Sequence, residues 1–289
     1  MTVKTVGVVG CGLMGHGIVQ VAAQAGCQVI AFEADAGALE KGLSRIKKSF
    51  AKLVEKEKIS QAQADAAFGA IKGSGNIADL KDCDLVVEAI VENLDVKNGL
   101  FKQLGELCKP ETIFASNTSS FSVGTMGEAS GRPERMVGLH FFNPVQLMKL
   151  VEVVRTDKTS DEVFAEAKAF GEACGKVPVS AKDTPGFVVN RLLVPYLAEA
   201  IRMVERGDAT PADVDAGMTL GCGHPMGPFT LLDYVGLDTT MFILEGWHRD
   251  HPGEPLFEIP KLLKDKVDAG KLGRKTGEGF YRWEGDKRA

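Results

Sequence analysis

The feature that most constrains the fold of this chain is a glycine pattern at positions 10–15, which reads Gly10-Cys11-Gly12-Leu13-Met14-Gly15. An apolar run at 6–9 precedes it, and apolar residues recur after it at helical spacing, at Ile18, Val21, Ala22 and Ala25. A strand, a glycine turn and a helix in this order form the phosphate-binding unit of dinucleotide folds. The three glycines allow a tight turn, close approach of a pyrophosphate, and packing of helix on strand.

Glu33 ends the next apolar run, 29–32, and lies 33 − 15 = 18 residues beyond Gly15. An acid at about this distance hydrogen-bonds the adenosine ribose in such folds. A carboxylate here would also repel the extra phosphate of NADP, and Asp35 adds more negative charge. The sequence therefore predicts NAD as the cofactor. The alternative is that Glu33 is a solvated turn residue.

Composition narrows the class of protein. The 289 residues suffice for two domains, and the net charge of −5 argues against a nucleic-acid partner. The six cysteines show no spacing typical of metal ligands, so we expect no metal site and reduced thiols in a cytoplasmic protein. A strand within the first ten residues leaves no room for a signal peptide, and no apolar run is long enough to span a membrane.

Strand-like and helix-like segments alternate over residues 1–183. Strands are expected at 85–87, 113–115, 137–139 and 151–154, and helices at 98–107 and 162–174. This alternation predicts a Rossmann-like, doubly wound, mostly parallel sheet. From residue 184 the strand signals stop, and Pro185 and Pro211 each occupy a plausible first helical position. Residues 184–289 are therefore predicted to form an all-helical domain.

Two helices are expected between Glu33 and the strand at 85–87, as a helical hairpin inserted in the first domain. The first has an apolar stripe and a basic stripe; the basic one consists of Lys41, Arg45, Lys48, Lys52 and Lys56. Ser60 and Gln63 have the spacing of a capping box that starts the second helix. The basic stripe is either a binding surface for anions or an ordinary solvated face.

The apolar run at 192–197 in the second domain is too long for one helix face to bury in a small domain. It predicts a homodimer formed through the C-terminal helical domain. Burial against the first domain is the alternative.

His140 is the most promising of the five histidines. It follows the strand at 137–139, at the end of a parallel sheet where ligands bind, and two phenylalanines follow it. Glu152 interrupts an apolar strand and needs a partner, because burying a lone carboxylate is costly. The imidazole would be such a partner, which predicts a histidine–acid dyad.

Polar residues also cluster at 116–120, after another predicted strand, and Asn190 lies among apolar neighbours. The cluster is either a turn with local side-chain-to-backbone bonds or a set of groups that face a reacting carbon. Asn190 either packs within its helix or donates to a substrate carbonyl.

Several stretches, in order over nearly the whole chain, resemble the L-3-hydroxyacyl-CoA dehydrogenases and their bacterial 3-hydroxybutyryl-CoA dehydrogenase relatives. Besides positions 10–15, they are VEAIVEN at 87–93, SNTSS at 116–120, GLHFFNP at 138–144, KDTPGFVVNR at 182–191, PMGPF at 225–229, GLD at 236–238 and KTGEGFY at 275–281. The resemblance implies reversible, NAD-dependent oxidation of an (S)-3-hydroxyacyl-CoA, with a short-chain substrate such as 3-hydroxybutyryl-CoA.

The resemblance also implies roles for particular residues. His140 matches the catalytic base and Glu152 the acid that pairs with it, while Ser119 and Asn190 match the groups that hold the substrate oxygen. The implied cofactor contacts are Gly10, Cys11, Gly12, Leu13, Met14, Gly15, Glu33, Glu92, Lys97, Ser119, Asn143 and Lys275. Contacts to the coenzyme A part of the substrate are implied for Ser49 and Lys56.

Two other functions fit the same pattern. One is a related dehydrogenase that acts on a free hydroxy or sugar acid rather than on a thioester. The other is a structural protein that binds a nucleotide without catalysis. Activity on acetoacetyl-CoA separates the first from the predicted function, and tight NADH binding without turnover would indicate the second.

Overall fold

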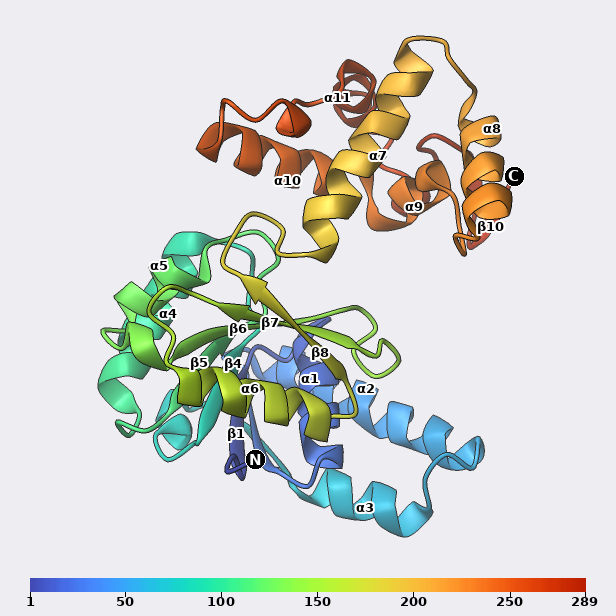
Figure 1. The fold of residues 1–289 in the computed structure, drawn as a ribbon. Helices are drawn as coiled ribbons and strands as arrows, with labels where there is room; N and C mark the ends of the chain where they lie inside the picture. Colours follow the sequence, from blue (N-terminus) through green and yellow to red (C-terminus); the bar gives the residue numbers. More distant parts are fainter. The chain divides into compact units, whose positions relative to one another are not determined.

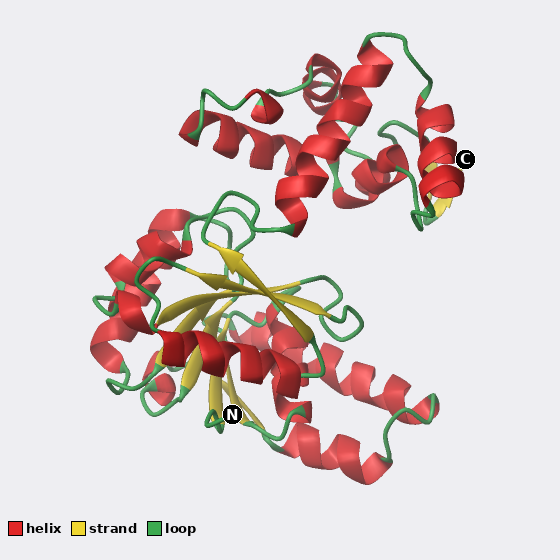
Figure 2. Cartoon of the chain, viewed as in Figure 1, coloured by secondary structure: helices red, strands yellow, loops and turns green.

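A computed structural model describes residues 1–289. The chain forms two compact units, Met1–Phe187 and Val188–Ala289, whose secondary structure is drawn in Figures 1 and 2. The boundary predicted from the sequence follows residue 183, four residues earlier than the observed one. Each unit has its own apolar core.

The first unit is built on an eight-stranded sheet of order β3-β2-β1-β4-β5-β6-β7-β8. Its strands are β1 Thr5–Val9, β2 Gln28–Phe32, β3 Ile71–Ser74, β4 Leu85–Glu88, β5 Ile113–Ser116, β6 Met136–Phe141, β7 Leu150–Arg155 and β8 Val177–Lys182. From β3 to β6 all neighbours are parallel; β7 is antiparallel to β6, and β8 is parallel to β7. The predicted Rossmann-like, mostly parallel sheet is confirmed.

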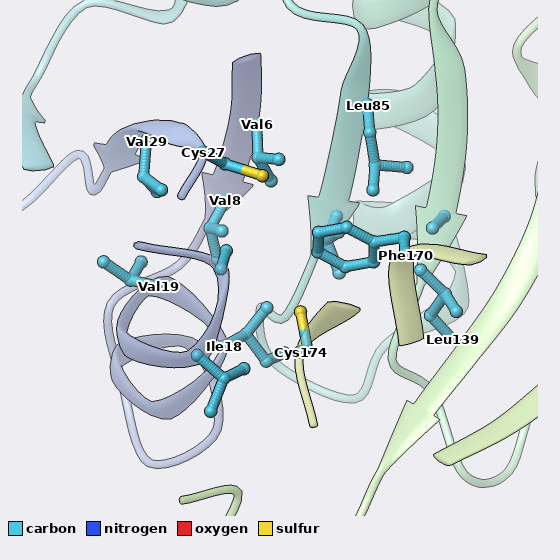
Figure 3. Packing of buried hydrophobic residues seen from close by; sticks show 14 of the residues in the cluster. Val6, Val8, Ile18, Val19, Cys27, Val29, Leu85, Leu139, Phe170 and Cys174 are labelled. Carbon is cyan, nitrogen blue, oxygen red and sulfur yellow. The ribbon is translucent and has the colours of Figure 1, made fainter. Parts of the chain in front are cut away.

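Helices cover both faces of this sheet. They are α1 Gly15–Gln24, α2 Ala36–Glu55, α3 Gln61–Gly69, α4 Leu94–Leu107, α5 Val123–Ala129 and α6 Asp161–Ala173. Successive residues of β1 point to opposite faces of the sheet. Val6 and Val8 belong to the core formed with α1, α2, α3 and α6, and Val9 belongs to the core formed with α4 and α5. Figure 3 shows the first of these cores, in which Ile18 of α1 and Phe170 of α6 lie beside the strand residues.

The helical hairpin is formed by α2 and α3, as predicted. Ser60 and Gln63 make both bonds of the capping box: the Ser60 hydroxyl oxygen accepts from the Gln63 N–H (3.2 Å), and the Gln63 side chain accepts from the Ser60 N–H (2.8 Å). Ile46 and Phe50 of the apolar stripe are buried against α1 and α3. All five residues of the basic stripe are exposed, which keeps that face available to anions.

Two strands of the sheet, β3 and β8, were missed by the sequence analysis. Both are edge strands: each pairs with one neighbour only. The β3 sequence contains Gly73, and β8 contains Pro178, a residue that an edge strand tolerates. Neither strand therefore has the continuous apolar run that marked the central ones. The orientation of β7 was also not foreseen.

The second unit is mainly helical, as predicted, with α7 Val189–Glu205, α8 Pro211–Ala216, α9 Pro228–Val235, α10 Leu237–Asp250 and α11 Lys261–Asp268. It also contains a short antiparallel pair, β9 Trp283–Glu284 and β10 Lys287–Arg288, which the prediction of an all-helical domain lacked. Asp233 of α9 connects the helices to this strand pair, because its carboxylate accepts hydrogen bonds from the Phe280 and Tyr281 N–H groups just before β9 and from the Trp283 indole N–H of β9. No helix of the chain is both long and apolar enough to cross a bilayer.

The predicted helix start at Pro185 is wrong. Gly186 and Phe187 both have positive φ values, 75° and 53°, so the chain turns there, and α7 begins only at Val189. Pro185 lies within this turn rather than at the first position of the helix. The helix ends at Glu205, with Arg206 as the C-cap residue and Gly207 directly after it with a φ of 76°.

Candidate active site and cofactor site

The glycine turn connects β1 to α1, and its geometry requires glycine at positions 10 and 15. Gly10 has a φ of 95°, and its N–H donates to the Phe32 carbonyl oxygen at 2.9 Å, which ties the turn to the end of β2. A Cβ on Gly10 would lie 2.6 Å from the Ala89 carbonyl oxygen, and one on Gly15 would overlap the Gly10 carbonyl oxygen. Gly12 has no neighbouring atom on that side, so a ligand can approach its backbone.

The residues around this turn fit a dinucleotide. No side chain caps α1, and no acidic residue occupies its first turn, so its N-terminal N–H groups are available to phosphate. Glu33 directly follows β2 and lies beside the turn, where its carboxylate accepts from the Cys11 N–H at 3.0 Å. Burial and then the Glu33 charge raise the pKa of the Cys11 thiol to about 11, so Cys11 stays a neutral packing residue.

A buried ionic network lies next to the turn, between β4, β5 and α4. Lys97 is 1% exposed, and its Nζ lies 2.6 Å from a carboxylate oxygen of Glu88 and 3.1 Å from one of Glu92. The other Glu88 oxygen accepts from the Ser116 hydroxyl at 2.6 Å, and Glu92 accepts from the Thr118 hydroxyl. Lys97 and Ser116 therefore fix the two acids, of which Glu92 remains partly exposed.

The predicted pair of His140 and Glu152 is present. The two residues face each other directly in the antiparallel β6–β7 ladder, and Nδ1 of His140 lies 2.6 Å from Oε2 of Glu152. The histidine is 6% exposed and the glutamate is fully buried. The predicted position of His140, after a strand of a parallel sheet, is wrong. His140 lies within β6, and Glu152 lies on β7, the strand that runs antiparallel to β6.

Aromatic rings and one amide complete the surroundings of the histidine. The ring centroid of Phe142 lies 4.6 Å from that of His140, and the ring centroid of Phe187 lies 5.6 Å away. Asn117 accepts from the Phe141 N–H at 2.9 Å, which joins the loop after β5 to the end of β6. Asn117 lies within the polar cluster at 116–120, where no individual role was predicted for it; its position directly after the central strand β5 was the available signal.

Two family models match the chain. One, described as the NAD binding domain of 3-hydroxyacyl-CoA dehydrogenase, matches residues 5–184, and the other, the C-terminal domain of the same enzyme, matches residues 186–283. The chain belongs to the 3-hydroxyacyl-CoA dehydrogenase family. This membership confirms the resemblance noted in the sequence and the predicted cofactor, NAD.

Similar proteins include other members of this dehydrogenase family. The mitochondrial hydroxyacyl-coenzyme A dehydrogenase of Homo sapiens is 51% identical, over 98% of this chain and 92% of the relative. A probable 3-hydroxybutyryl-CoA dehydrogenase of Deinococcus radiodurans is 50% identical, over 96% of this chain and 99% of the relative. A crystal structure of the (S)-3-hydroxybutyryl-CoA dehydrogenase from Ralstonia eutropha has a TM-score of 0.95 at 41% identity, covering 98% of this chain and 100% of the other.

The polar cluster at 116–120 of this dehydrogenase makes side-chain-to-backbone bonds, one of the two functions considered for it. Most of its side chains make internal bonds: Ser116 to Glu88, Asn117 to the Phe141 N–H, and Thr118 to Glu92 and to backbone N–H groups. The hydroxyl of Ser119 bonds only that of Ser120, at 3.2 Å. These bonds hold the loop, and the contact of Ser119 with a ligand stays a prediction.

The remaining predicted contacts are distributed over both units of the dehydrogenase. In the first unit, Ser49 is half-buried on α2, Lys56 is exposed at the C-cap of that helix, and Asn143 is exposed in the loop after β6. In the second unit, Asn190 lies in the first turn of α7, and Lys275 is 47% exposed and pairs with Asp238 at 2.6 Å. Their contacts with cofactor and substrate stay predictions.

Proposed function

We propose that this chain oxidises the 3-hydroxyl group of (S)-3-hydroxyacyl-CoA thioesters to a ketone and also catalyses the reverse reduction. The observation that carries the proposal is the short contact between His140 and the fully buried Glu152. It provides a general base in a chain whose first unit also carries a dinucleotide turn. Family membership supports the thioester as the substrate class.

The dyad determines which nitrogen of His140 reacts. A carboxylate can only accept, so Nδ1 carries a proton that it donates to Glu152, and Nε2 keeps a lone pair. Nε2 can then take the hydroxyl proton of the substrate, and the Glu152 carboxylate stabilises the imidazolium that forms. In the reverse direction the imidazolium returns the proton to the new alcohol.

NAD, when bound, supplies the acceptor for the hydride that leaves C3 of the substrate. The chain's own residues would hold it: the glycine turn and the α1 N-terminus would bind the phosphates, Glu33 would accept from the ribose hydroxyls, and Glu92 would make a further contact. The carboxylate of Glu33 beside Cys11 supports a preference for NAD over NADP. Phe142 covers one side of His140 and limits access of water to it.

We assign the substrate oxygen to Ser119 and Asn190, and the coenzyme A part to Ser49 and Lys56. Lys56 belongs to the exposed basic stripe of α2, and cations of this kind bind phosphate groups. The names of the similar bacterial proteins support a short acyl chain, such as 3-hydroxybutyryl. We place the reaction in fatty-acid β-oxidation. We also place the protein in the cytoplasm, because its cysteines are free thiols and form no disulfide.

A homodimer through the second unit is part of the same proposal. Leu192, Phe242 and Leu256 of this unit are 71%, 49% and 50% exposed, and such large apolar side chains are typical of an interface. Other members of the apolar run, such as Val194 and Leu197, pack in the unit's own core. The run is therefore only partly available to a second copy, and sedimentation of the protein at micromolar concentration tests the dimer.

Replacing the base tests the function. His140→Gln should lower kcat for acetoacetyl-CoA reduction by NADH by a factor of about 10² or more, the scale of general-base catalysis. The fall in absorbance of NADH measures the rate, and His251→Gln, a change at an exposed histidine of the second unit, is the matched control. Near-wild-type turnover by His140→Gln would contradict the proposal, and so would activity confined to acids without coenzyme A.

A further inference from the structure

Residues 183–187 form a turn after β8 that ends against the proposed catalytic histidine. The Phe187 N–H donates to the Thr184 carbonyl oxygen at 3.0 Å, and φ is 75° at Gly186 and 53° at Phe187. A left-handed backbone suits glycine but is uncommon for a bulky residue. Such a conformation persists only where the surroundings hold it, and it is concentrated at functional sites. The position of the Phe187 ring, rather than local backbone preference, therefore accounts for this turn.

The Phe187 ring lies between the apolar core and the histidine. Phe187 is 7% exposed and belongs to the core cluster that contains Val123, Met136 and Val154. On its other side the ring meets His140 edge-on, with the two ring planes at 61°. Phe142 packs against the same imidazole at 54°. The Glu152 bond fixes one atom of the imidazole, and the two rings restrict its rotation about that bond.

Asp183 fixes the other end of the turn. Its carboxylate accepts hydrogen bonds from the Ser122 hydroxyl (2.7 Å), the Val123 N–H (3.0 Å) and the Gly124 N–H (2.8 Å). These three donors lie where α5 begins, just after the loop that carries Ser119. The turn is thus attached at one end to α5 and at the other end to the core beside His140.

We propose that Phe187 is a positioning residue for His140, and that Asp183 holds the turn that presents it. Phe187 touches the base and makes no bond to substrate or cofactor in this scheme; it keeps Nε2 directed at the hydroxyl group. This inference rests on the proposed function in assigning the base to His140. It adds a second constraint on the imidazole, independent of Glu152.

Kinetics of three variants test the proposal. Phe187→Leu should lower kcat at least tenfold and leave the KM values for NADH and acetoacetyl-CoA within about twofold, because a small misplacement of a catalytic group lowers the rate without removing binding contacts. Asp183→Asn, which keeps the size but loses acceptor capacity, should lower kcat in the same way and by less. Phe101→Leu is the control: Phe101 is buried in the same cluster and packs against Phe114.

A measurement without substrate separates this inference from the proposed function. In protein with ¹⁵N-labelled histidine, the Nδ1 proton in the short bond to Glu152 should give a far-downfield resonance, assigned by its loss in His140→Gln. It should broaden and exchange faster with water in Phe187→Leu and stay unchanged in Phe101→Leu. If Phe187→Leu does not fold, Phe187→Met, which keeps the bulk without the rigid ring, takes its place.

The outcomes are distinct. An unchanged resonance together with an unchanged kcat in the Phe187 variants overturns the inference. If only Asp183→Asn behaves as wild type, the part assigned to Asp183 is overturned and the part assigned to Phe187 stands. If the wild type turns over no thioester but the resonance depends on Phe187, the proposed function fails while the positioning of His140 is supported.

Discussion

The buried pair of Glu88 and Lys97 offers the sharpest test of how the first unit is held together. Glu88→Gln keeps the shape of the side chain, and its amide oxygen can still accept from the Ile90 N–H, while its NH2 group can donate to the Ser116 hydroxyl oxygen instead of accepting from that hydroxyl. The change removes the negative charge 2.6 Å from the Lys97 ammonium. Orphaning a buried charge costs about 3–5 kcal/mol. Because Glu92 remains 3.1 Å from the ammonium, we expect the lower end, about 3 kcal/mol.

This free energy corresponds to a measurable change in melting temperature. For a protein unit of this size, 1 kcal/mol corresponds to about 2–4 °C, so Glu88→Gln should melt about 6–12 °C below wild type. Calorimetry gives the midpoint, and urea unfolding followed by circular dichroism gives the free energy. The double variant Glu88→Gln/Lys97→Met should recover most of the loss, because no buried charge is then unpaired.

A surface pair provides the control. Lys158 and Glu128 also lie in the first unit, with a 2.5 Å contact, but their side chains are 60% and 57% exposed. Lys158→Met should change stability by less than about 0.5 kcal/mol, as surface substitutions usually do. A loss below about 1 kcal/mol in Glu88→Gln, or a double variant less stable than the single one, would refute the reasoning.

Three further changes have defined outcomes. Gly15→Ala should abolish NAD binding in calorimetry and lower the melting temperature, because the new Cβ would overlap the Gly10 carbonyl; retained affinity would contradict the tight turn. Ser60→Ala should cost about 1 kcal/mol in urea unfolding through loss of the α3 cap, and no change would mean that the cap is frayed in solution. Burial by itself would raise the pKa of Asp84, but hydrogen bonds from Lys109 and from backbone N–H groups hold it below the usual value. The ionised Asp84 carboxylate therefore stabilises the folded state above its unfolded pKa of about 3.9, and this stabilisation is lost as pH falls through the lower folded pKa. Asp84→Asn should then flatten the acid side of a plot of unfolding free energy against pH. An unchanged slope would contradict this sign.

The central part of the fold was predictable because its signals are local. The glycine turn, the apolar central strands and the capping box at Ser60 each occupy a short stretch, and each forms as expected. The edge strands β3 and β8 were not predictable, since an edge strand needs no continuous apolar run. The turn at Gly186 and Phe187 was missed because a phenylalanine with positive φ gives no sequence signal.

The candidate site, too, was only partly predictable from the sequence. Pairing of His140 with Glu152 could be inferred because a buried acid needs a partner, but the strand direction that pairs them depends on the whole sheet. The network around Lys97 could not be inferred, because its members are brought together from β4, β5 and α4. A lysine in an amphipathic helix is ordinarily exposed, and only the tertiary structure shows that this one is buried.

Because β6 and β7 are antiparallel neighbours, the pairing of His140 with Glu152 depends on the register of the two strands rather than on the length of the loop that joins them. Base and acid are opposite partners on one ladder, so the hairpin loop between them can grow or shrink without separating them, provided the ladder keeps its register. A slip by a single residue would instead turn the carboxylate to the other side of the sheet. Base and acid should therefore stay paired when the loop varies in length beyond Phe142, Asn143 and the buried Val145, whereas an insertion inside either strand should separate the pair and abolish turnover.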